Sequence, residues 1–212
     1  MRIKKQYTCS KVTKNYLITD LLDFDWQSRV ELIEQISSSL TLIPKISFTQ
    51  TVANELLYHQ QLVVKERCPK ESILAKLQCL ALELDDFSAT GLVHGDICYK
   101  NILYDGFAFR LVDLEPSFNQ IRNGRSVLLY TPPYIALDDY KNNNLTSATD
   151  KVGFYFFCKR LLDPIINFSP RRLMKNIECG ESLVQIFTGI NEAEFIEMNY
   201  ESIFKIFVGN YR

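Results

Sequence analysis

Three oxygen-bearing side chains, those of Asp96, Asn101 and Asp113, are spaced in a way that suits metal-assisted phosphate chemistry. Asp105-Gly106 stands between two apolar runs, which is a strong signal for a two-residue hairpin turn. Such a hairpin would put Asn101 near the start of its first strand and Asp113 near the end of its second, so these ends meet. Asp96 enters the same neighbourhood from the preceding loop.

The chemistry that this set supports is phosphoryl transfer with a hard cation. Magnesium takes oxygen ligands and keeps waters and phosphate oxygens in the rest of its shell, so few protein ligands suffice. We assign Asn101 and Asp113 to Mg²⁺ or Mn²⁺, and Asp96 to orienting the attacking hydroxyl and accepting its proton. Any one of these residues alone is explained better as a turn residue, because Asp and Asn favour turns for local reasons.

The first part of the chain should supply strands and one helix. Residues 1–20 are typical of one or two strands, with a turn from Ser10 to Asn15, and residues 46–65 of two or three strands. Between them, apolar residues recur at helical spacing from Trp26 to Leu40. The composition changes near residues 65–70, where mixed strands give way to mostly helix.

The second part should be helical around the candidate residues. The strongest periodic signal predicts a helix from Ile73 to Phe87 with one buried stripe. A further helix from about Thr149 to Leu162 is apolar around most of its circumference, which predicts burial on nearly all sides. Short helices should follow, one of them opened by a capping box of Asn191 and Glu194.

Composition excludes several classes of function. With 212 residues, 47% of them hydrophobic, the chain can bury a sizeable core, and 24 basic against 25 acidic residues give no overall field for nucleic acid or membrane. The six cysteines form no C-x-x-C pair, which argues against structural zinc. The longest dense apolar patch, Val152 to Cys158, is too short to span a bilayer. We expect a cytoplasmic protein with reduced thiols.

His94-Gly95-Asp96 with Asn101, and Asp113 twelve residues later, resembles the catalytic loop and magnesium aspartate of the protein kinase superfamily. The resemblance implies ATP as the co-substrate. It also implies that His94 supports the loop and does not carry protons. Lys100 is a candidate for a charge supplied from the same loop, with a solvated lysine as the alternative.

The resemblance extends to other segments. Residues 131–138 look like the end of a kinase activation segment, with Asp138 where the family usually has Glu. Asp150 matches the aspartate of that family's helix F, which anchors the catalytic loop backbone. The helix at 73–87 matches the one that precedes the catalytic loop, and residues 62–69 resemble the hinge.

The implied fold is α+β: a bilobal protein kinase-like fold with a reduced N-lobe and a mostly helical C-lobe. Residues 1–66 would form the N-lobe, made of strands and a helix, and residues 67–212 the C-lobe. No glycine precedes Gly91, so the Gly-rich loop that covers the phosphates in ordinary kinases is absent. We expect slower turnover, or dependence on an activating protein partner.

The lysine–glutamate pair that holds the ATP phosphates in the family has several candidates here. Glu34 borders the apolar stripe of its expected helix while Glu31 points away, so Glu34 is the better candidate. Its partner would be Lys14 or Lys11, with Lys4 and Lys5 as weaker candidates. An exposed helical glutamate is the competing explanation for either acid.

Three functions fit the sequence. The activation-segment resemblance favours a compact Ser/Thr protein kinase that uses Mg-ATP. His-Gly-Asp and the Asp113-Leu114-Glu115 triplet resemble aminoglycoside- and choline-kinase-like enzymes, which phosphorylate small-molecule hydroxyls. The absent Gly-rich loop and the uncertain phosphate-binding lysine favour a pseudokinase that acts as a binding or regulatory module, whereas the intact Asp96, Asn101 and Asp113 oppose it. Cys98 stands where Ser/Thr kinases usually carry Lys.

Overall fold

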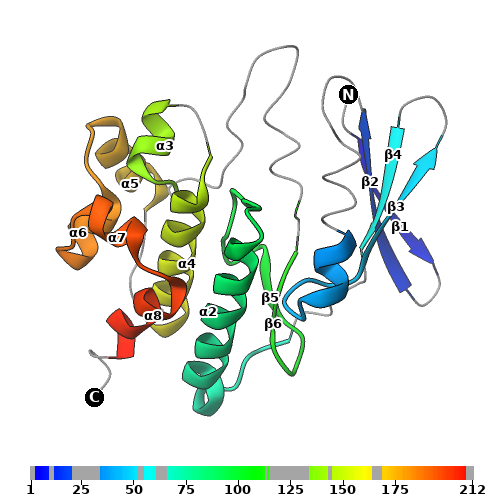
Figure 1. The fold of residues 1–212 in the computed structure, drawn as a ribbon, viewed down its shortest axis with the longest axis horizontal. Helices are drawn as coiled ribbons and strands as arrows, with labels where there is room; N and C mark the ends of the chain where they lie inside the picture. Colours follow the sequence, from blue (N-terminus) through cyan, green and yellow to red (C-terminus); the bar gives the residue numbers. More distant parts are fainter. Residues whose placement is uncertain are drawn as a thin grey trace. The chain divides into compact units, whose positions relative to one another are not determined.

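The computed structural model describes residues 3–9, 12–20, 34–51, 55–60, 66–112, 114, 134–142, 145–163 and 169–208. The chain has an α+β fold and divides into two compact units (Figure 1). The first unit comprises Met1–Arg67 with Leu103–Val112, and the second comprises Cys68–Ile102 with Asp113–Arg212. Among the described residues, no helix combines the length and apolarity that crossing a membrane requires.

The first unit contains an antiparallel sheet of four strands in the order β1-β2-β4-β3. These strands are Ile3–Cys9 (β1), Val12–Asp20 (β2), Ile46–Thr51 (β3) and Glu55–Gln60 (β4). The strands expected in these regions are confirmed. The expected turn from Ser10 to Asn15 is wrong in extent, because Val12 already pairs with Cys9 and the β-branched Val12 and Thr13 favour a strand.

A short helical segment accompanies this sheet in the first unit. Residues 34–39 are helical, and the remainder of the helix expected from Trp26 lies largely outside the described residues. The chain then turns through Leu42 and Ile43, which are both buried. The carbonyl of Leu42 accepts a hydrogen bond of 2.8 Å from the amide of Leu111, so the segment after the helix is tied to the hairpin strand that carries Leu111.

The hairpin is formed by β5 (Ile102–Tyr104) and β6 (Phe109–Leu111). Its connection is longer than the expected two-residue turn at Asp105-Gly106, so that prediction is wrong. The Asp105 carboxylate accepts hydrogen bonds from the amides of Phe107 and Ala108, at 2.9 and 2.8 Å. These side-chain bonds stabilise a wider loop than a two-residue turn, as Asp does in Asx-turns.

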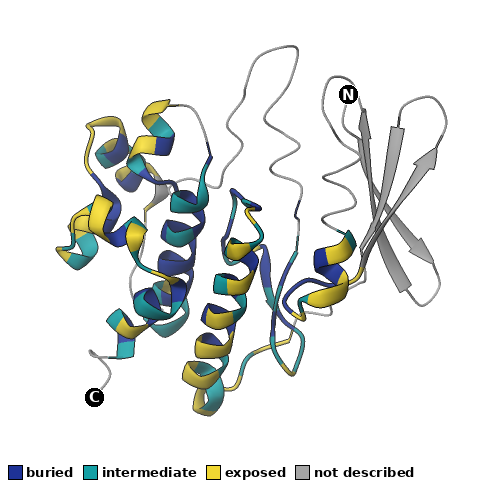
Figure 2. Ribbon diagram, in the orientation of Figure 1, coloured by how far each residue is buried: buried dark blue, intermediate teal, exposed yellow. Residues whose placement is uncertain are grey.

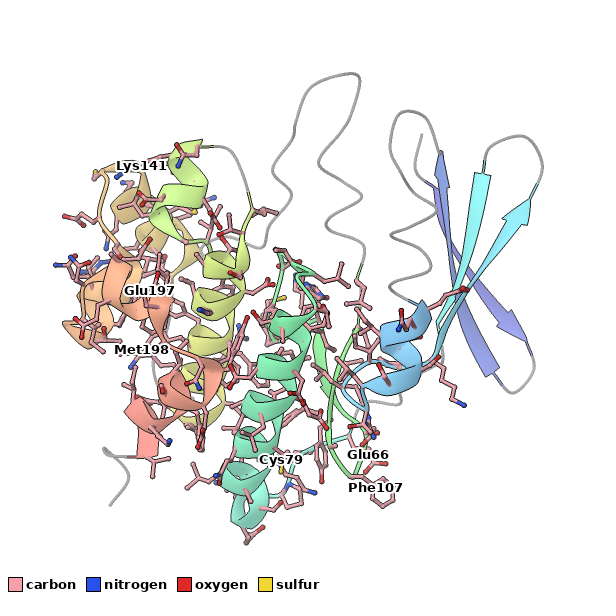
Figure 3. All side chains as sticks on the ribbon, in the orientation of Figure 1. Glu66, Cys79, Phe107, Lys141, Glu197 and Met198 are labelled. Carbon is pink, nitrogen blue, oxygen red and sulfur yellow. The ribbon has the colours of Figure 1, made fainter. Side chains whose placement is uncertain are left out.

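The wider loop has its own close contacts in the first unit. Gly106 has a φ of 95°, and a Cβ built there would lie 2.9 Å from the Glu66 carboxylate. Figure 3 labels Glu66 and Phe107 at this end of the hairpin. The Glu66 amide donates a 2.7 Å hydrogen bond to the carbonyl of Tyr104. Glycine at this position therefore satisfies both the backbone conformation and the available space.

The second unit is helical, and most of the buried apolar side chains that the structure describes lie in it. After a short 3₁₀ turn, η1 (Lys70–Ser72), α2 runs Ile73–Ala89 and α4 runs Ser147–Leu162. Both helices confirm the sequence prediction. α2 is exposed on one side, whereas α4 is dark blue along most of its length in Figure 2, which fits its apolar circumference.

The last helix, α8 (Tyr200–Val208), packs against both long helices. The Tyr200 ring lies 5.4 Å from Phe154, and the Phe207 ring lies 5.1 Å from Tyr155. Asp85 on α2 accepts hydrogen bonds from the amides of Tyr200 and Glu201, so it caps the first turn of α8. The shorter helices are α3 (Leu137–Asn142), α5 (Pro170–Glu178), α6 (Leu183–Thr188) and α7 (Glu192–Glu197).

The boundaries of two helices have clear local causes. α2 ends just before Gly91, which takes a φ of 78° that other residues rarely adopt. Asn191 is the N-cap of α7, as expected, and its side chain accepts a 2.9 Å hydrogen bond from the amide of Ala193. The helix stop at Gly91 releases the chain into the loop that carries the candidate residues.

Candidate active site

The loop at 94–101 is anchored by a carboxylate far away in the sequence. Asp150, in the first turn of α4, accepts hydrogen bonds of 2.7 Å from the amides of both His94 and Gly95. Each amide bonds a different carboxylate oxygen. This contact between Asp150 and the loop backbone is the one implied by the kinase resemblance, and it is confirmed.

The Asp150 carboxyl lies in the interior with 1% of its surface exposed. Burial raises its pKa to about 6, against the effect of nearby His94 and of the amide bonds from His94 and Gly95. A buried acceptor of two backbone donors is costly to remove, because both amides would lose their partner away from water. The start of the loop is therefore fixed by a strong tertiary contact.

The residue types of His94-Gly95-Asp96 follow from this geometry. Gly95 has a φ of 78°, a conformation that favours glycine over any residue with a Cβ. His94 is 1% exposed, and its Nδ1 accepts a hydrogen bond of 3.2 Å from the amide of Asp96. Burial and this local bond suit a supporting role for His94.

Asp96 and Asn101 lie together. The amide nitrogen of Asn101 donates to the Asp96 backbone carbonyl at 2.8 Å and to the Asp96 carboxylate at 3.0 Å. Asn101 is 7% exposed and Asp96 is half-buried. Because the nitrogen of Asn101 faces two acceptors, its Oδ1 must point the other way, and no hydrogen bond from a described residue reaches that oxygen. The structure thus brings together two of the three residues proposed for phosphate chemistry.

Helix α4 approaches the loop through a glycine that the sequence analysis did not single out. A Cβ built on Gly153 would lie 2.2 Å from the carbonyl oxygen of Ile97, closer than any real contact. Gly153 and Ile97 are both fully buried. A glycine one turn after the anchoring Asp150 was the available signal, since Gly in a helix interior often has a packing reason.

The segment before α3 is held by a buried polar network. Thr149 of α4 accepts a 3.2 Å hydrogen bond from the amide of Ala136 and donates one of 2.6 Å to Asp139. Asp139 also accepts hydrogen bonds from the amide and hydroxyl of Thr146, both at 2.9 Å. Asp139 is 5% exposed, so the network closes a polar cluster inside the second unit.

Asp138, which we expected at the position of the family's glutamate, lies next to this network. Its carboxylate is exposed and lies 3.9 Å from the ammonium of Lys141 on α3. The buried carboxylate in this turn of the helix is that of the next residue, Asp139, because the helix phase turns the two side chains to different faces. The correspondence of Asp138 with the family's glutamate stays a prediction.

Several predicted site residues lie outside the described residues. Asp113 and Glu115 are among them, as are residues 131–133 and Lys11. Their proposed roles stay predictions. Leu114, between the two acids, is described and is buried.

The predicted phosphate-binding pair is only partly described. Lys14 lies on β2 opposite Tyr7, and the structure describes its backbone but not its side chain. Glu34 is half-buried at the start of the described helix, where its carbonyl accepts hydrogen bonds of 2.9 Å from the hydroxyls of Ser37 and Ser38. The pairing of Lys14 with Glu34 stays a prediction.

Two further loop residues are placed. Cys98 is buried and has the character of a core residue, whereas Lys100 is exposed. Within the described part of the chain, no group of three His, Cys, Asp or Glu side chains could hold a metal ion. The set proposed for Mg²⁺ includes Asp113, which lies outside that part.

Comparison with known proteins leaves the site to be judged on its own geometry. No protein-family model matches the chain, and no curated protein matches it.

Proposed function

We propose that this chain is an ATP-dependent phosphotransferase, acting as a compact atypical Ser/Thr protein kinase on a protein hydroxyl. The observation that carries the proposal is the construction of the loop at 94–101. Asp150 holds two consecutive amides at its start, and Asn101 bonds Asp96 at its end. Such support of the loop backbone by a buried carboxylate is expected where a loop must hold a catalytic side chain in one position.

In the proposed reaction Asp96 orients the acceptor hydroxyl. The hydroxyl oxygen attacks the γ-phosphorus of ATP, and its proton passes to the Asp96 carboxylate. The bond between the γ-phosphorus and the bridging oxygen breaks, and ADP leaves with that electron pair. The bond from the Asn101 amide would hold the Asp96 carboxylate in one orientation, which favours in-line attack.

The side chain of Asn101 offers an oxygen atom that suits a magnesium ion. An asparagine Oδ1 that accepts no hydrogen bond from the described residues is a ligand of the kind that Mg²⁺ takes. Asn101 and Asp113 would hold Mg²⁺ or Mn²⁺. When bound, the ion would neutralise charge on the ATP phosphates.

The remaining parts of the proposal follow from the same resemblance. The first unit would correspond to a reduced N-lobe (1–66) and the second to a helical C-lobe (67–212). Lys14 and Glu34 would support ATP binding, and an activating protein partner would compensate for the missing Gly-rich cover. We propose a cytoplasmic location because none of the five cysteines whose side chains are described forms a disulfide.

A second candidate is a nucleotide-binding regulator without transfer activity. It is favoured by one specific observation, the lack of any glycine before Gly91. A small-molecule kinase is the third candidate, supported by His-Gly-Asp and by Asp113-Leu114-Glu115. The protein kinase is preferred because Thr149 and Asp139 fix the segment after residue 133, where the activation-segment resemblance lies.

The test is phosphate incorporation from γ-labelled ATP with Mg²⁺ or Mn²⁺, comparing the wild type with Asp113→Ala. Autophosphorylation and a broad set of protein and small-molecule acceptors should be screened, with and without binding partners purified from the native host. We expect labelled product with the wild type and its loss in the variant. Neither transfer nor nucleotide-induced thermal stabilisation would contradict the proposal. Stabilisation by ATP that is lost in Asp113→Ala, without transfer, would identify the regulator.

A further inference from the structure

A cation stacked on a tyrosine lies in the same loop as Asp96. The guanidinium carbon of Arg160, in the last turn of α4, lies 3.7 Å from the centre of the Tyr99 ring. The ammonium of the next loop residue, Lys100, lies 6.0 Å from the same ring centre. We call Tyr99, Lys100 and Arg160 the cation–tyrosine cluster.

The loop side of the cation–tyrosine cluster is rigidly connected to Asp96. Tyr99 and Lys100 are the central residues of a turn in which the amides of Asn101 and Ile102 both donate to the carbonyl of Cys98, at 2.9 and 3.0 Å. The side chain of Asn101, at the end of the same turn, donates a hydrogen bond to the Asp96 carboxylate. A ligand bound at Tyr99 and Lys100 would therefore be positioned relative to the Asp96 carboxylate.

Tyr134 provides a second sign of where Arg160 lies. Tyr134 is buried and its ring lies 5.5 Å from the Phe156 ring in the core. Burial raises the pKa of Tyr134, while the proximity of Arg160 acts in the opposite direction. The stack of Arg160 on Tyr99 already restricts the arginine side chain, so less side-chain freedom is lost when it binds an anion.

No described carboxylate forms an ion pair with the cation–tyrosine cluster. Within the part of the chain that the structure describes, no ion pair involves Arg160, Lys100 or Lys159. Cations in the last turn of a helix are favoured by the helix dipole, which accounts for Lys159 and Arg160 being basic. The dipole does not account for Arg160 stacking on a loop residue, nor for a lysine beside that residue.

We propose that the cation–tyrosine cluster binds an anionic side chain of a peptide substrate, so that the acceptor hydroxyl lies in an acidic or phosphorylated sequence. This inference rests on the proposed kinase function and names its substrate class. Arg160 has donors left for bidentate contact with a carboxylate or phosphate, and Lys100 supplies a mobile point charge beside it. Because the whole chain has a net charge of -1, a preference for anionic peptides would have to come from local positive charge and not from an overall positive field.

Peptide binding tests the inference without requiring catalysis. Labelled serine peptides flanked by glutamate, phosphoserine, alanine or lysine would be titrated against the full chain, with fluorescence anisotropy as the readout. We expect the glutamate and phosphoserine peptides to bind about tenfold more tightly than the alanine peptide, a difference typical of one charge-assisted contact. Comparing the first two peptides shows whether the site favours carboxylate or phosphate.

Charge reversal supplies the matched comparison. Arg160→Glu should abolish the preference for acidic peptides, and Arg160→Glu combined with Lys100→Glu should favour the lysine peptide. Lys175→Glu, on the exposed face of α5, changes the net charge equally and should leave the preference intact. Equal binding of acidic and alanine peptides to the wild type, or no binding of the acidic peptides, would overturn the inference. So would equal loss of preference in Lys175→Glu.

Phosphate transfer to the same peptides separates this inference from the proposed function. Acidic preference in binding, without transfer to any peptide, would support the cluster and contradict the kinase. Transfer to alanine and glutamate peptides at equal kcat/KM would support the kinase and overturn the inference.

Discussion

In the loop at 94–101 and in the turn at 105–108, two backbone amides donate hydrogen bonds to an aspartate carboxylate. The two aspartates lie at very different distances in the sequence from the amides that they bind. Asp150 reaches amides 56 and 55 residues away, whereas Asp105 reaches the amides two and three residues after itself. The first contact fixes a loop to the core of the second unit. The second shapes a turn within the first unit.

The two aspartates also differ in their electrostatics. Burial raises the pKa of Asp150 to about 6. For Asp105 burial acts in the same direction, but hydrogen bonds from Ala108, Arg110 and Phe107 outweigh it and lower the pKa. The turn is therefore built in a way that stabilises its charge, while the loop anchor is held in the interior despite its charge. Such an expensive arrangement is typical of functional sites.

Removing the long-range anchor should have the largest effect. Asp150→Ala leaves two buried amides without a partner, and we expect a loss of roughly 2–5 kcal/mol in the free energy of unfolding. Asp105→Ala, in a partly exposed turn, should cost only about 1 kcal/mol. Urea denaturation of both variants checks the comparison, with the exposed Asp86→Ala as control. Equal losses for Asp150→Ala and Asp105→Ala would contradict the ranking.

Substituting Gly153, where α4 lies against the loop, should have the next largest effect on the free energy of unfolding. Gly153→Ala would place a methyl group 2.2 Å from the Ile97 carbonyl, so the helix or the loop must move. We expect a loss of about 1–3 kcal/mol, with overpacking as the cause. Gly180→Ala adds the same methyl group where nothing lies within 4 Å, at a φ of 81°. Its cost should be no more than about 1–2 kcal/mol, from backbone conformation alone.

The readout for these glycine variants should include the loop itself. Amide hydrogen exchange at His94 and Gly95 should accelerate in Gly153→Ala beyond the change in global stability, and should follow global stability in Gly180→Ala. Equal changes in amide exchange at His94 and Gly95 in both variants would contradict the claim that the packing of Gly153 against Ile97 stabilises the loop at 94–101.

The two aspartates should respond to pH with opposite signs. Folded Asp150 keeps its proton to higher pH than the unfolded chain, so its contribution is present below its ordinary pKa of 3.8 and is lost as pH rises towards about 6. The change amounts to about 3 kcal/mol at most. Asp105 has a lowered pKa, so its contribution is present above its ordinary value and is lost as pH falls.

Urea denaturation between about pH 3 and pH 7 measures how the contribution of each aspartate to the free energy of unfolding changes with pH. The proteins to compare are the wild type, Asp150→Asn and Asp105→Asn. The difference in free energy of unfolding between the wild type and Asp150→Asn should become smaller as pH rises. The corresponding difference for Asp105→Asn should become smaller as pH falls. Gaps that moved in the same direction would show that the two carboxyl groups are not in opposite environments.

The sequence predicted the long helices because their apolar spacing is a local property. Periodicity placed α2 and its buried residues, and the apolar circumference of α4 predicted its burial. The contact of Asp150 with the loop followed from a family resemblance, since spacing alone cannot join residues 56 positions apart. The role of Gly153 depends on how two segments approach each other, and no local pattern contains that information.

The sequence did not determine which of two neighbouring aspartates is buried, nor how long the hairpin loop is. Asp138 and Asp139 are chemically identical, and only the helix phase and the hydroxyls of Thr146 and Thr149 decide which is buried. The hairpin loop was predicted too short because Asp105 bonds the amides of a wider loop. In both cases the decisive term was a side-chain hydrogen bond whose geometry depends on the folded chain.

The central claim is that the anchored loop presents Asp96 as the base of a phosphoryl transfer. The most direct measurement is the rate of γ-phosphate transfer at saturating Mg-ATP for the wild type, Asp96→Asn and the exposed control Asp86→Asn. We predict that Asp96→Asn lowers the rate by about 10²–10⁴-fold with an unchanged Tm, and that Asp86→Asn matches the wild type. Transfer by Asp96→Asn at the wild-type rate would contradict the account.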